Sequence, residues 1–151
     1  MEELQNRLQN RKLKILVADD QRVNLDVIRM NMEQMTLLKD LEFFTDGQQV
    51  IDRIMEILEM RDLASCPIDA LLLDFQMPVK NGIQVVREVK TLYAKQNTKN
   101  PELTLKEPLY VFFTAHAANK QFREHSYASG VDYVLEKPIA AVTLEMIMGR
   151  L

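Results

Sequence analysis

Five side chains that could bind a metal ion or a phosphoryl group lie at or just after the ends of short apolar runs. The runs with these residues are KILVA at 14–18 with Asp19 and Asp20, ALLL at 70–73 with Asp74, YVFF at 110–113 with Thr114, and VDYVL at 131–135 with Lys137. Crowded carboxylates repel one another, and a divalent cation that prefers oxygen ligands, such as Mg²⁺, relieves that repulsion. A lysine and a threonine nearby would supply positive charge and a hydrogen-bond donor to phosphoryl oxygens. The residue types therefore predict a phosphoryl site with Mg²⁺, provided that the fold brings them together.

The apolar pattern of the chain predicts the elements that would do so. A weaker run, LEFF at 41–44, adds a fifth strand to the four above. Continuous apolar runs are typical of parallel strands that are covered on both faces. Between the strands, apolar residues recur at helical spacing; these are Leu25, Ile28, Met32 and Met35, then Val50, Ile54 and Leu58, then Ile83, Val86, Val89 and Tyr93, followed by a helix over 119–129 and a helix from about Ala141 with Leu144, Ile147 and Leu151. The pattern predicts an α/β fold, a doubly wound five-stranded parallel sheet with helices on both faces.

In such a sheet, ligands bind at the carboxyl ends of the strands, where the five polar residues would meet. The stretch LLLDFQMPVKNG at 71–82 shows how one of them would be held. Its leucines anchor Asp74 to a rigid strand, Met77-Pro78 shape the loop, and Gly82 allows the next helix to begin close to the sheet. Asn81 is suited to a turn or a helix cap.

Length and composition restrict the class of protein. The chain has 151 residues, 47% of them hydrophobic, and a formal net charge of −3, so we expect one globular domain without a basic stripe for nucleic acid. No apolar run approaches the ~20 residues of a membrane span, and the single Cys66 favours a reducing, cytoplasmic location. We expect a leader or linker helix at 1–12, the domain at 13–151 and a mobile surface loop at 97–108.

These segments resemble a known family. DDQRVN, DFQMPVKNG, TAHA and GVDYVLEKPI are similar to segments of two-component response-regulator receiver domains, most of all those of hybrid sensor histidine kinases. The resemblance covers nearly all of residues 13–151 and implies a flavodoxin-like receiver topology. It implies a histidine kinase or a histidine phosphotransfer protein as phosphodonor and the remainder of a hybrid sensor kinase as a further partner, without direct contact with nucleic acid or membrane.

The resemblance also implies roles for individual residues. Such a domain catalyses only its own phosphorylation and dephosphorylation, and it signals through the face formed by the helix at 119–129, the strand at 131–135 and the helix from about Ala141. The bond between Lys137 and Pro138 would be cis. The site residues would be Asp74 as phosphoacceptor, Asp19, Asp20 and Asp74 with the backbone carbonyl of Gln76 as Mg²⁺ ligands, and Thr114 and Lys137 as contacts of the phosphoryl group.

The chain departs from the family pattern at the position three residues before Lys137. The family usually has an aromatic there, whereas this chain has Val134, with Tyr133 one position earlier. Because neighbouring strand side chains face opposite sides, Tyr133 cannot take over that direction without a bulge or a register change. Switching would then rely on Thr114 and its loop. His116 occupies a position that in the family influences the lifetime of the phosphoryl group, as does Gln76.

Other interpretations compete with this one. A hydrolase of the haloacid-dehalogenase type also uses a strand-end aspartate and Mg²⁺, but its general acid would fall at Gln76. A nucleotide or flavin binder needs a glycine-rich turn, and the turn after the first strand has no glycine. A degenerate receiver would bind proteins without phosphorylation. Val134 leaves this alternative open, and the intact Asp19-Asp20 pair with Asp74, Thr114 and Lys137 argues against it. Alone, Asp19-Asp20 would more often cap a helix, and His116 and His125 would be ordinary surface histidines.

Overall fold

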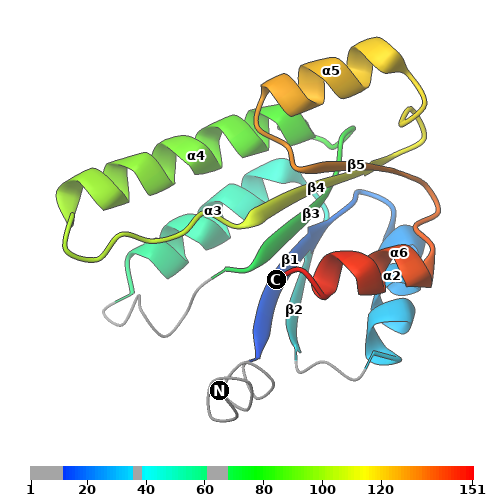
Figure 1. The fold of residues 1–151 in the computed structure, drawn as a ribbon, viewed down its shortest axis with the longest axis horizontal. Coiled ribbons are helices and arrows are strands. Elements are labelled where there is room, and N and C mark those ends of the chain that lie inside the picture. Colours follow the sequence, from blue (N-terminus) through cyan, green and yellow to red (C-terminus); the bar gives the residue numbers. More distant parts are fainter. Residues whose placement is uncertain (1–11, 36–38, 61–67) are drawn as a thin grey trace.

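The computed structural model describes residues 12–35, 39–60 and 68–151. Strands and helices alternate along these segments (Figure 1). In chain order the elements are β1 (Leu13–Ala18), α2 (Arg22–Glu33), β2 (Lys39–Phe44), α3 (Gly47–Leu58), β3 (Ala70–Asp74), α4 (Gly82–Lys99), β4 (Leu109–Thr114), α5 (Lys120–Ala128), β5 (Tyr133–Glu136) and α6 (Ala141–Met148). The predicted leader at 1–12 falls almost wholly outside the described residues, as does Cys66.

The strands form one parallel sheet in the order β2-β1-β3-β4-β5. Helices α3, α4 and α5 cover one face, and α2 and α6 cover the other (Figure 1). This is the predicted doubly wound, flavodoxin-like receiver topology. Since all strands run in the same direction, their carboxyl ends lie at one edge of the sheet, which is the edge where β1, β3 and β4 deliver their terminal polar residues.

The core consists of two apolar clusters, one on each face of the sheet. Alternate residues of one strand enter opposite clusters: Leu16 and Ala18 pack with α3 and α4, whereas Ile15 and Val17 pack with α2 and α6. This explains why the central strands read as continuous apolar runs, since both faces are buried. The three leucines of β3 have no exposed surface, so β3 is a rigid support for the residue at its end.

Local hydrogen bonds fix where the helices begin. Asn81 and Gln84 form a reciprocal capping box at the start of α4, at 2.9 Å for each bond. Asp46 and Asn119 cap α3 and α5 by accepting from backbone N–H groups. Such caps satisfy donors that the first helical turn leaves free. Asn81 is thus a helix cap, as its position predicts.

The structure corrects three details of the sequence analysis. Strand β5 begins at Tyr133 rather than residue 131, and just before it Asp132 exchanges two hydrogen bonds of 2.8 Å with the backbone of Tyr110, one through its N–H and one through its side chain. Helix α4 continues to Lys99, and the side chain of Asn97 holds the following segment by two hydrogen bonds to the backbone of Leu105. The predicted loop at 97–108 therefore starts later. Leu151 lies beyond the end of α6 and is exposed, so it is not part of that helix's apolar stripe.

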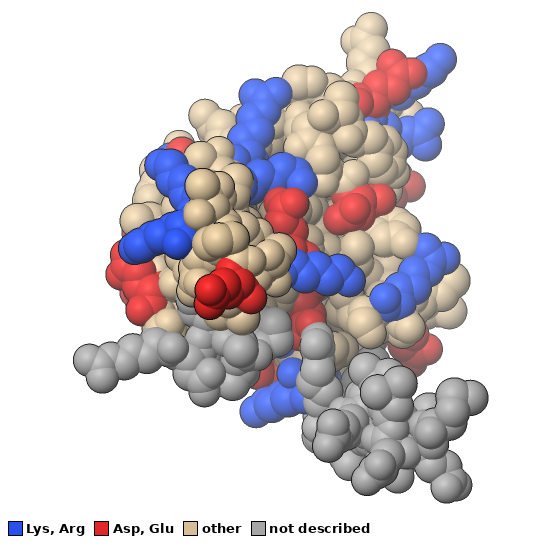
Figure 2. Space-filling model, turned by 60° about the vertical axis from the view of Figure 1, so that its left-hand side comes forward, with Lys and Arg blue, Asp and Glu red and all other residues tan. Residues whose placement is uncertain are grey.

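Charge is distributed without a strong bias to one sign. On the face shown in Figure 2, lysine and arginine side chains are interspersed with aspartate and glutamate side chains. Among the described residues, no helix is both long and apolar enough to cross a membrane.

Candidate functional site

The predicted site residues meet at the carboxyl edge of the sheet. Asp19 follows β1, Asp74 ends β3, Thr114 ends β4 and Lys137 follows β5. Asp19, Asp20 and Asp74 each offer one carboxylate oxygen, and these oxygens lie within 4.8 Å of one another. Three segments far apart in sequence therefore bring their charged side chains into one small volume.

Asp74 is held by its strand and by the close approach of α4. The backbone N–H of Gly82 donates to the carbonyl of Phe75 at 2.8 Å. A Cβ at Gly82 would lie 2.8 Å from Cε1 of Phe112 and 3.2 Å from the carbonyl oxygen of Asp74. No residue with a side chain fits there without displacing the strand or the ring, which gives a physical reason for glycine at this position.

Asp19 is the most enclosed of the three carboxylates, with no exposed surface. It accepts from the backbone N–H of Gln21 at 2.8 Å and from the side-chain amide of Asn24 at 3.0 Å. The N-cap residue of α2 is Gln21, which makes no side-chain cap bond. Asp19 is therefore not the N-cap of α2, and its second oxygen lies 2.8 Å from the ammonium of Lys137, as expected of a residue of the acidic site.

Lys137 supplies the positive charge between the carboxylates. Its ammonium lies 2.8 Å from Oδ2 of Asp19 and 3.2 Å from Oδ1 of Asp74. Burial alone would lower the pKa of Lys137, but the hydrogen bond to Asp19 and the charge of Asp74 raise it above the usual value. Lys137 therefore stays protonated at neutral pH.

Asp74 has the opposite balance of forces. Burial raises the pKa of its carboxyl group, the charge of Asp19 raises it further, and Lys137 only partly offsets both. Removal from water and like charges both disfavour the charged form of a carboxylate. The site consequently holds excess negative charge around Asp74, a condition that a cation would relieve.

Thr114 is buried, and its hydroxyl accepts from the backbone N–H of His116 at 3.2 Å. His116 itself is exposed, as is His125. Gln76 is also exposed, and the role of its carbonyl as a metal ligand stays a prediction.

Tyr133 and Val134 point in opposite directions, as strand alternation predicts. Val134 packs with the α3 and α4 cluster, and Tyr133 packs with the α2 and α6 cluster. The hydroxyl of Tyr133 accepts a hydrogen bond from Arg150, whose guanidinium lies 5.5 Å from the centre of the tyrosine ring. Tyr133 is thus engaged at the far side of the sheet from Val134. The Lys137-Pro138 bond is cis, as expected.

Two residues of the site were not predicted from sequence. Asn24 orients Asp19, and the ring of Phe113 lies 5.3 Å below the ammonium of Lys137. Asn24 could have been found, because a polar residue in the first turn of α2 can reach back to the aspartate before the helix. No sequence pattern indicated Phe113, because it lies in a continuous apolar strand whose aromatic residues are expected to pack in the core.

The donor set fits a hard divalent cation. Carboxylate oxygens are the ligands that Mg²⁺ prefers, and it is usually held by few protein oxygens with water in its other positions. Neither a cysteine nor a histidine belongs to the acidic group among the described residues, so the set does not suit zinc.

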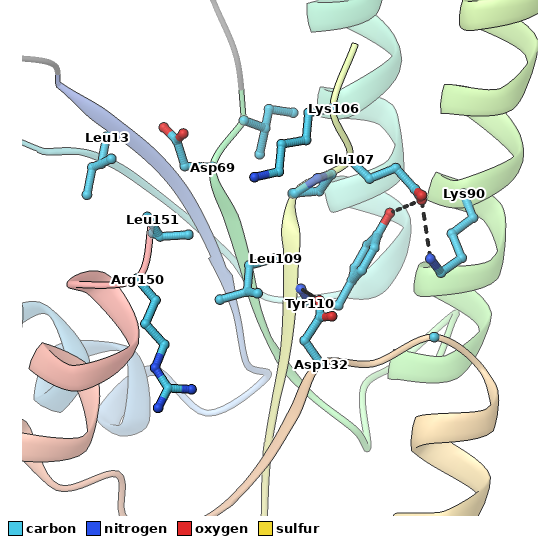
Figure 3. Close-up of a pocket in the computed structure, with 13 residues that line it drawn as sticks. Leu13, Asp69, Lys90, Lys106, Glu107, Leu109, Tyr110, Asp132, Arg150 and Leu151 are labelled. Carbon is cyan, nitrogen blue, oxygen red and sulfur yellow. Dashed lines mark hydrogen bonds and ion pairs between the residues drawn. The ribbon is translucent and has the colours of Figure 1, made fainter. Parts of the chain in front are cut away.

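A pocket of about 570 Å³ lies at the opposite, amino-terminal edge of the sheet (Figure 3). Tyr110 donates to Glu107 at 2.9 Å, and Lys90 lies 3.3 Å from the same oxygen. Asp69 and Asp132 accept from backbone N–H groups of β1 and β4. These polar groups hold strand ends and a loop in place, and they lie away from the acidic cluster.

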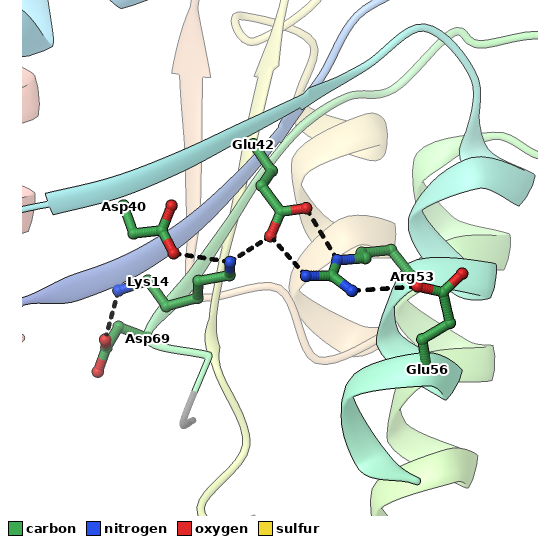
Figure 4. Close-up of polar contacts among 6 residues, drawn as sticks. All are labelled: Lys14, Asp40, Glu42, Arg53, Glu56 and Asp69. Carbon is green, nitrogen blue, oxygen red and sulfur yellow. Dashed lines mark hydrogen bonds and ion pairs between the residues drawn. The ribbon is translucent and has the colours of Figure 1, made fainter. Parts of the chain in front are cut away.

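A second charged group supports the edge strand β2 (Figure 4). Arg53 donates to both oxygens of Glu42, at 2.8 and 3.2 Å, and to Glu56 at 3.1 Å. Lys14 binds Glu42 as well and lies 2.9 Å from Asp40. Partial burial alone would raise the pKa of Glu42, but hydrogen bonds from Arg53 and Lys14 lower it. The network ties β1, β2 and α3 together at the edge of the sheet.

Comparison with known proteins agrees with the fold. The chain belongs to the response regulator receiver domain family, whose model matches residues 15–148. Its class is therefore that of the receiver domains of two-component phosphorelays.

Named relatives refine this placement. The chain is 30% identical over 138 residues to Histidine protein kinase 1 of Candida albicans, which covers 91% of this chain and 5% of that protein. The fold resembles the receiver domain of sensor histidine kinase PA1611 from Pseudomonas aeruginosa, solved with magnesium in its active-site cleft (TM-score 0.66, 24% identity, 93% and 97% of the two chains). It also resembles a Saccharomyces cerevisiae complex of the phosphotransfer protein Ypd1 with the Ssk1 receiver domain (TM-score 0.68, 20% identity, 89% and 84%). The chain thus spans only a small part of its kinase relative.

Proposed function

We propose that Asp74 is the phosphoacceptor of this receiver domain and takes a phosphoryl group from a phosphohistidine. The observation that carries the proposal is the group of three carboxylates within 4.8 Å, with Lys137 3.2 Å from Asp74. The donor is a histidine kinase or a histidine phosphotransfer protein. The Ypd1 complex of the Ssk1 receiver supports the second class of partner.

In the transfer, a carboxylate oxygen of Asp74 attacks phosphorus. The new P–O bond forms as the P–N bond breaks, and the electron pair of the P–N bond stays on the imidazole, which takes up a proton. An acyl phosphate on Asp74 is the product. The domain modifies only itself, which distinguishes it from an enzyme that turns over external substrates.

Lys137 and a bound Mg²⁺ would supply the positive charge that the transfer needs. Mg²⁺, held by Asp19, Asp20, Asp74 and the carbonyl of Gln76, would neutralise charge on the carboxylates and on the phosphoryl oxygens. The ammonium of Lys137, which bridges Asp19 and Asp74, can exchange the Asp74 contact for a phosphoryl oxygen. Positive charge that is already in place needs little reorganisation when the transition state forms.

Thr114 would report the modification. Among the described residues, the N–H of His116 at 3.2 Å is the one hydrogen-bond partner of its hydroxyl. A phosphoryl oxygen on Asp74 can therefore recruit the hydroxyl and pull the loop before α5 inward. Val134 presents no aromatic ring to follow that movement. We therefore assign the switch to Thr114 and the 115–119 loop, with α5, β5 and α6 as the responding face and His116 as a modulator of phosphoryl lifetime.

We further propose that the receiver occupies residues 13–151 and is joined to, or acts with, the remainder of a hybrid sensor kinase in the cytoplasm. The matched Candida albicans kinase is the main support for this placement. The residues before the domain would then be a leader or linker.

The test is intact mass spectrometry after incubation with Mg²⁺ and a small-molecule phosphodonor such as acetyl phosphate. We expect one phosphoryl addition to the wild-type protein and none in Asp74→Asn or without Mg²⁺. Asp52→Asn on α3 is the matched control, because Asp52 is a surface aspartate that accepts a hydrogen bond from the side chain of Gln48 at 2.8 Å; it should be phosphorylated normally. A folded protein that binds Mg²⁺ but takes up no phosphoryl group would favour a degenerate receiver that acts by binding alone.

A further inference from the structure

Helix α2 is apolar on two opposite sides. Leu25, Ile28 and Met32 face the core, as expected of an amphipathic helix. The side that faces solvent carries Val23, Val27 and Met30, which are 64%, 40% and 61% exposed. These residues are spaced four and three positions apart, so they form one stripe along the helix. A solvent-facing apolar stripe needs an explanation that core packing does not supply.

The neighbouring helix α6 has the same property. Leu144, Ile147 and Met148 are buried, while Val142 and Met146 are 66% and 59% exposed. The two helices lie side by side on one face of the sheet (Figure 1). The side chain of Asn31 on α2 also reaches the carbonyl of Ile139, just before α6, at 3.5 Å. Together the exposed residues make one apolar patch across two helices, which we call the α2/α6 patch (Val23, Val27, Met30, Val142 and Met146).

A row of alternating charge runs beside the stripe on α2. Arg22, Asp26, Arg29 and Glu33 are all exposed and are four, three and four positions apart, so they share one flank of the helix. Within the part of the chain that the structure describes, no ion pair involves any of these four, although their spacing would permit pairs along the helix. Arg29 rests over the ring of Phe43, with its guanidinium 4.4 Å from the ring centre.

The charges of this row would pair with those of the same row on a second copy of α2 that runs in the opposite direction. When two copies of α2 lie antiparallel about a twofold axis near Val27, Arg22 of one copy faces Glu33 of the other, and Asp26 faces Arg29. Each pairing occurs twice by symmetry. The apolar stripes meet in the same arrangement, because the axis places both charged flanks on one side of the helix pair.

We propose that the α2/α6 patch is a self-association surface, on which a second copy of this chain docks with α2 antiparallel to α2. Two helices of 12 and 8 residues are only about 18 and 12 Å long, which limits the contact area. The dimer is consequently weak, with a dissociation constant in the micromolar range, about 1–500 μM. This dimer does not depend on phosphorylation of Asp74, so its test is separate from that of the proposed function.

The first test is the dimer dissociation constant from analytical ultracentrifugation of the unmodified domain. Met30→Glu should raise it at least about tenfold, because the glutamate places two like charges in an apolar contact. Met55→Glu is the matched control, since Met55 is a helical methionine of 42% exposure on the other side of the sheet. It should leave the constant within about twofold of wild type. Equal effects of the two variants, or a monomer at about 1 mM, would overturn the proposal.

The second test uses charge reversal. Arg22→Glu and Glu33→Arg should each weaken the dimer about fivefold or more, since each leaves two like-charge contacts. The double variant should recover to within about twofold of wild type. Single variants that weaken a dimer without recovery in the double variant would overturn the antiparallel arrangement.

A phosphodonor protein is the competing occupant of this patch. In one outcome, the domain is monomeric and Met30→Glu slows phosphoryl transfer from a phosphohistidine protein. This outcome would assign the patch to that donor and overturn the dimer. Phosphorylation by the small-molecule donor should be unchanged by Met30→Glu, which shows that the variant keeps its fold and its acidic site.

Discussion

Replacing Asp74 with asparagine should stabilise the metal-free protein, although it removes a contact to Lys137. Asp74 lies within 4.8 Å of carboxylate oxygens of Asp19 and Asp20 and 3.2 Å from the ammonium of Lys137. With an effective dielectric constant of about 20, two repulsions at that distance amount to about 7 kcal/mol and the attraction to about 5 kcal/mol. Repulsion thus exceeds attraction by about 2 kcal/mol, which destabilises the charged form of Asp74. Burial of the carboxylate destabilises the charged form further.

Solvent screening reduces this figure, so we expect a gain of about 1–2 kcal/mol in the free energy of unfolding at pH 7. For a domain of this size, that corresponds to a rise in Tm of about 3–6 °C. Lys137 keeps its 2.8 Å contact to Asp19 in the variant, so no buried charge is left without a partner. Asp52→Asn is the control and should stay within about 0.5 kcal/mol of wild type.

The gain should depend on pH in a defined direction. The pKa of Asp74 is raised above its unfolded value of 3.8, so the folded protein holds this proton more tightly than the unfolded chain does. The resulting stability is present below the unfolded pKa and is lost as pH rises through the folded pKa. The difference between Asp74→Asn and wild type should therefore be near zero below about pH 3.8 and grow toward neutral pH.

Urea unfolding in a chelating buffer at several pH values measures this difference. Mg²⁺ should then stabilise the wild-type protein much more than the variant, because the variant has lost one ligand. A lower stability of Asp74→Asn than of wild type at pH 7 without Mg²⁺ would show that the contact to Lys137 outweighs the repulsion between the carboxylates. A gain of the same size at all pH values would contradict the reasoning, since the effect would not come from charge.

Three further substitutions test the supports of the site and the sheet edge. Gly82→Ala should cost about 1–3 kcal/mol of unfolding free energy, because its Cβ would lie 2.8 Å from Phe112; Gly149→Ala, whose nearest such atom is 3.3 Å away, should cost less, and equal losses would contradict the steric argument. Asn81→Ala should cost about 1 kcal/mol through loss of the capping box, whereas Gln21→Ala, which removes no side-chain cap bond, should be nearly neutral in the same urea titration. Glu42→Gln should cost about 1–2 kcal/mol at pH 7; because the pKa of Glu42 is lowered in the fold, the cost should fade as pH drops through that pKa, and a loss independent of pH would exclude an ionic origin.

The sequence predicts most of the fold because local and long-range signals agree. Continuous apolar runs require two covered faces, and the intervening helical stripes provide the covers. Once the strands are parallel, the positions of Asp19, Asp74, Thr114 and Lys137 at strand ends are sufficient to bring them to one edge. This is why four distant residues could be placed in one site without coordinates.

Other features depend on contacts that no local pattern encodes. Asp132 and Tyr110 are 22 residues apart, yet they are joined by a hydrogen bond beside the start of β5. The sequence did not predict that α4 extends over residues 97–99, because polar residues at the exposed end of a helix have the same pattern as a polar loop. The position of Lys137 between Asp19 and Asp74, rather than facing solvent, follows from the relative placement of β1, β3 and β5.

The most direct test of the proposed function is to locate the phosphoryl group. The phosphorylated domain would be reduced with borohydride, which converts an acyl phosphate to the corresponding alcohol, and the peptides would be sequenced by mass spectrometry. We predict conversion of Asp74 to homoserine, with Asp19 and Asp20 unchanged. Conversion at Asp19 or Asp20, or a phosphoryl group that survives the reduction on another residue, would contradict the assignment of Asp74 as the phosphoacceptor.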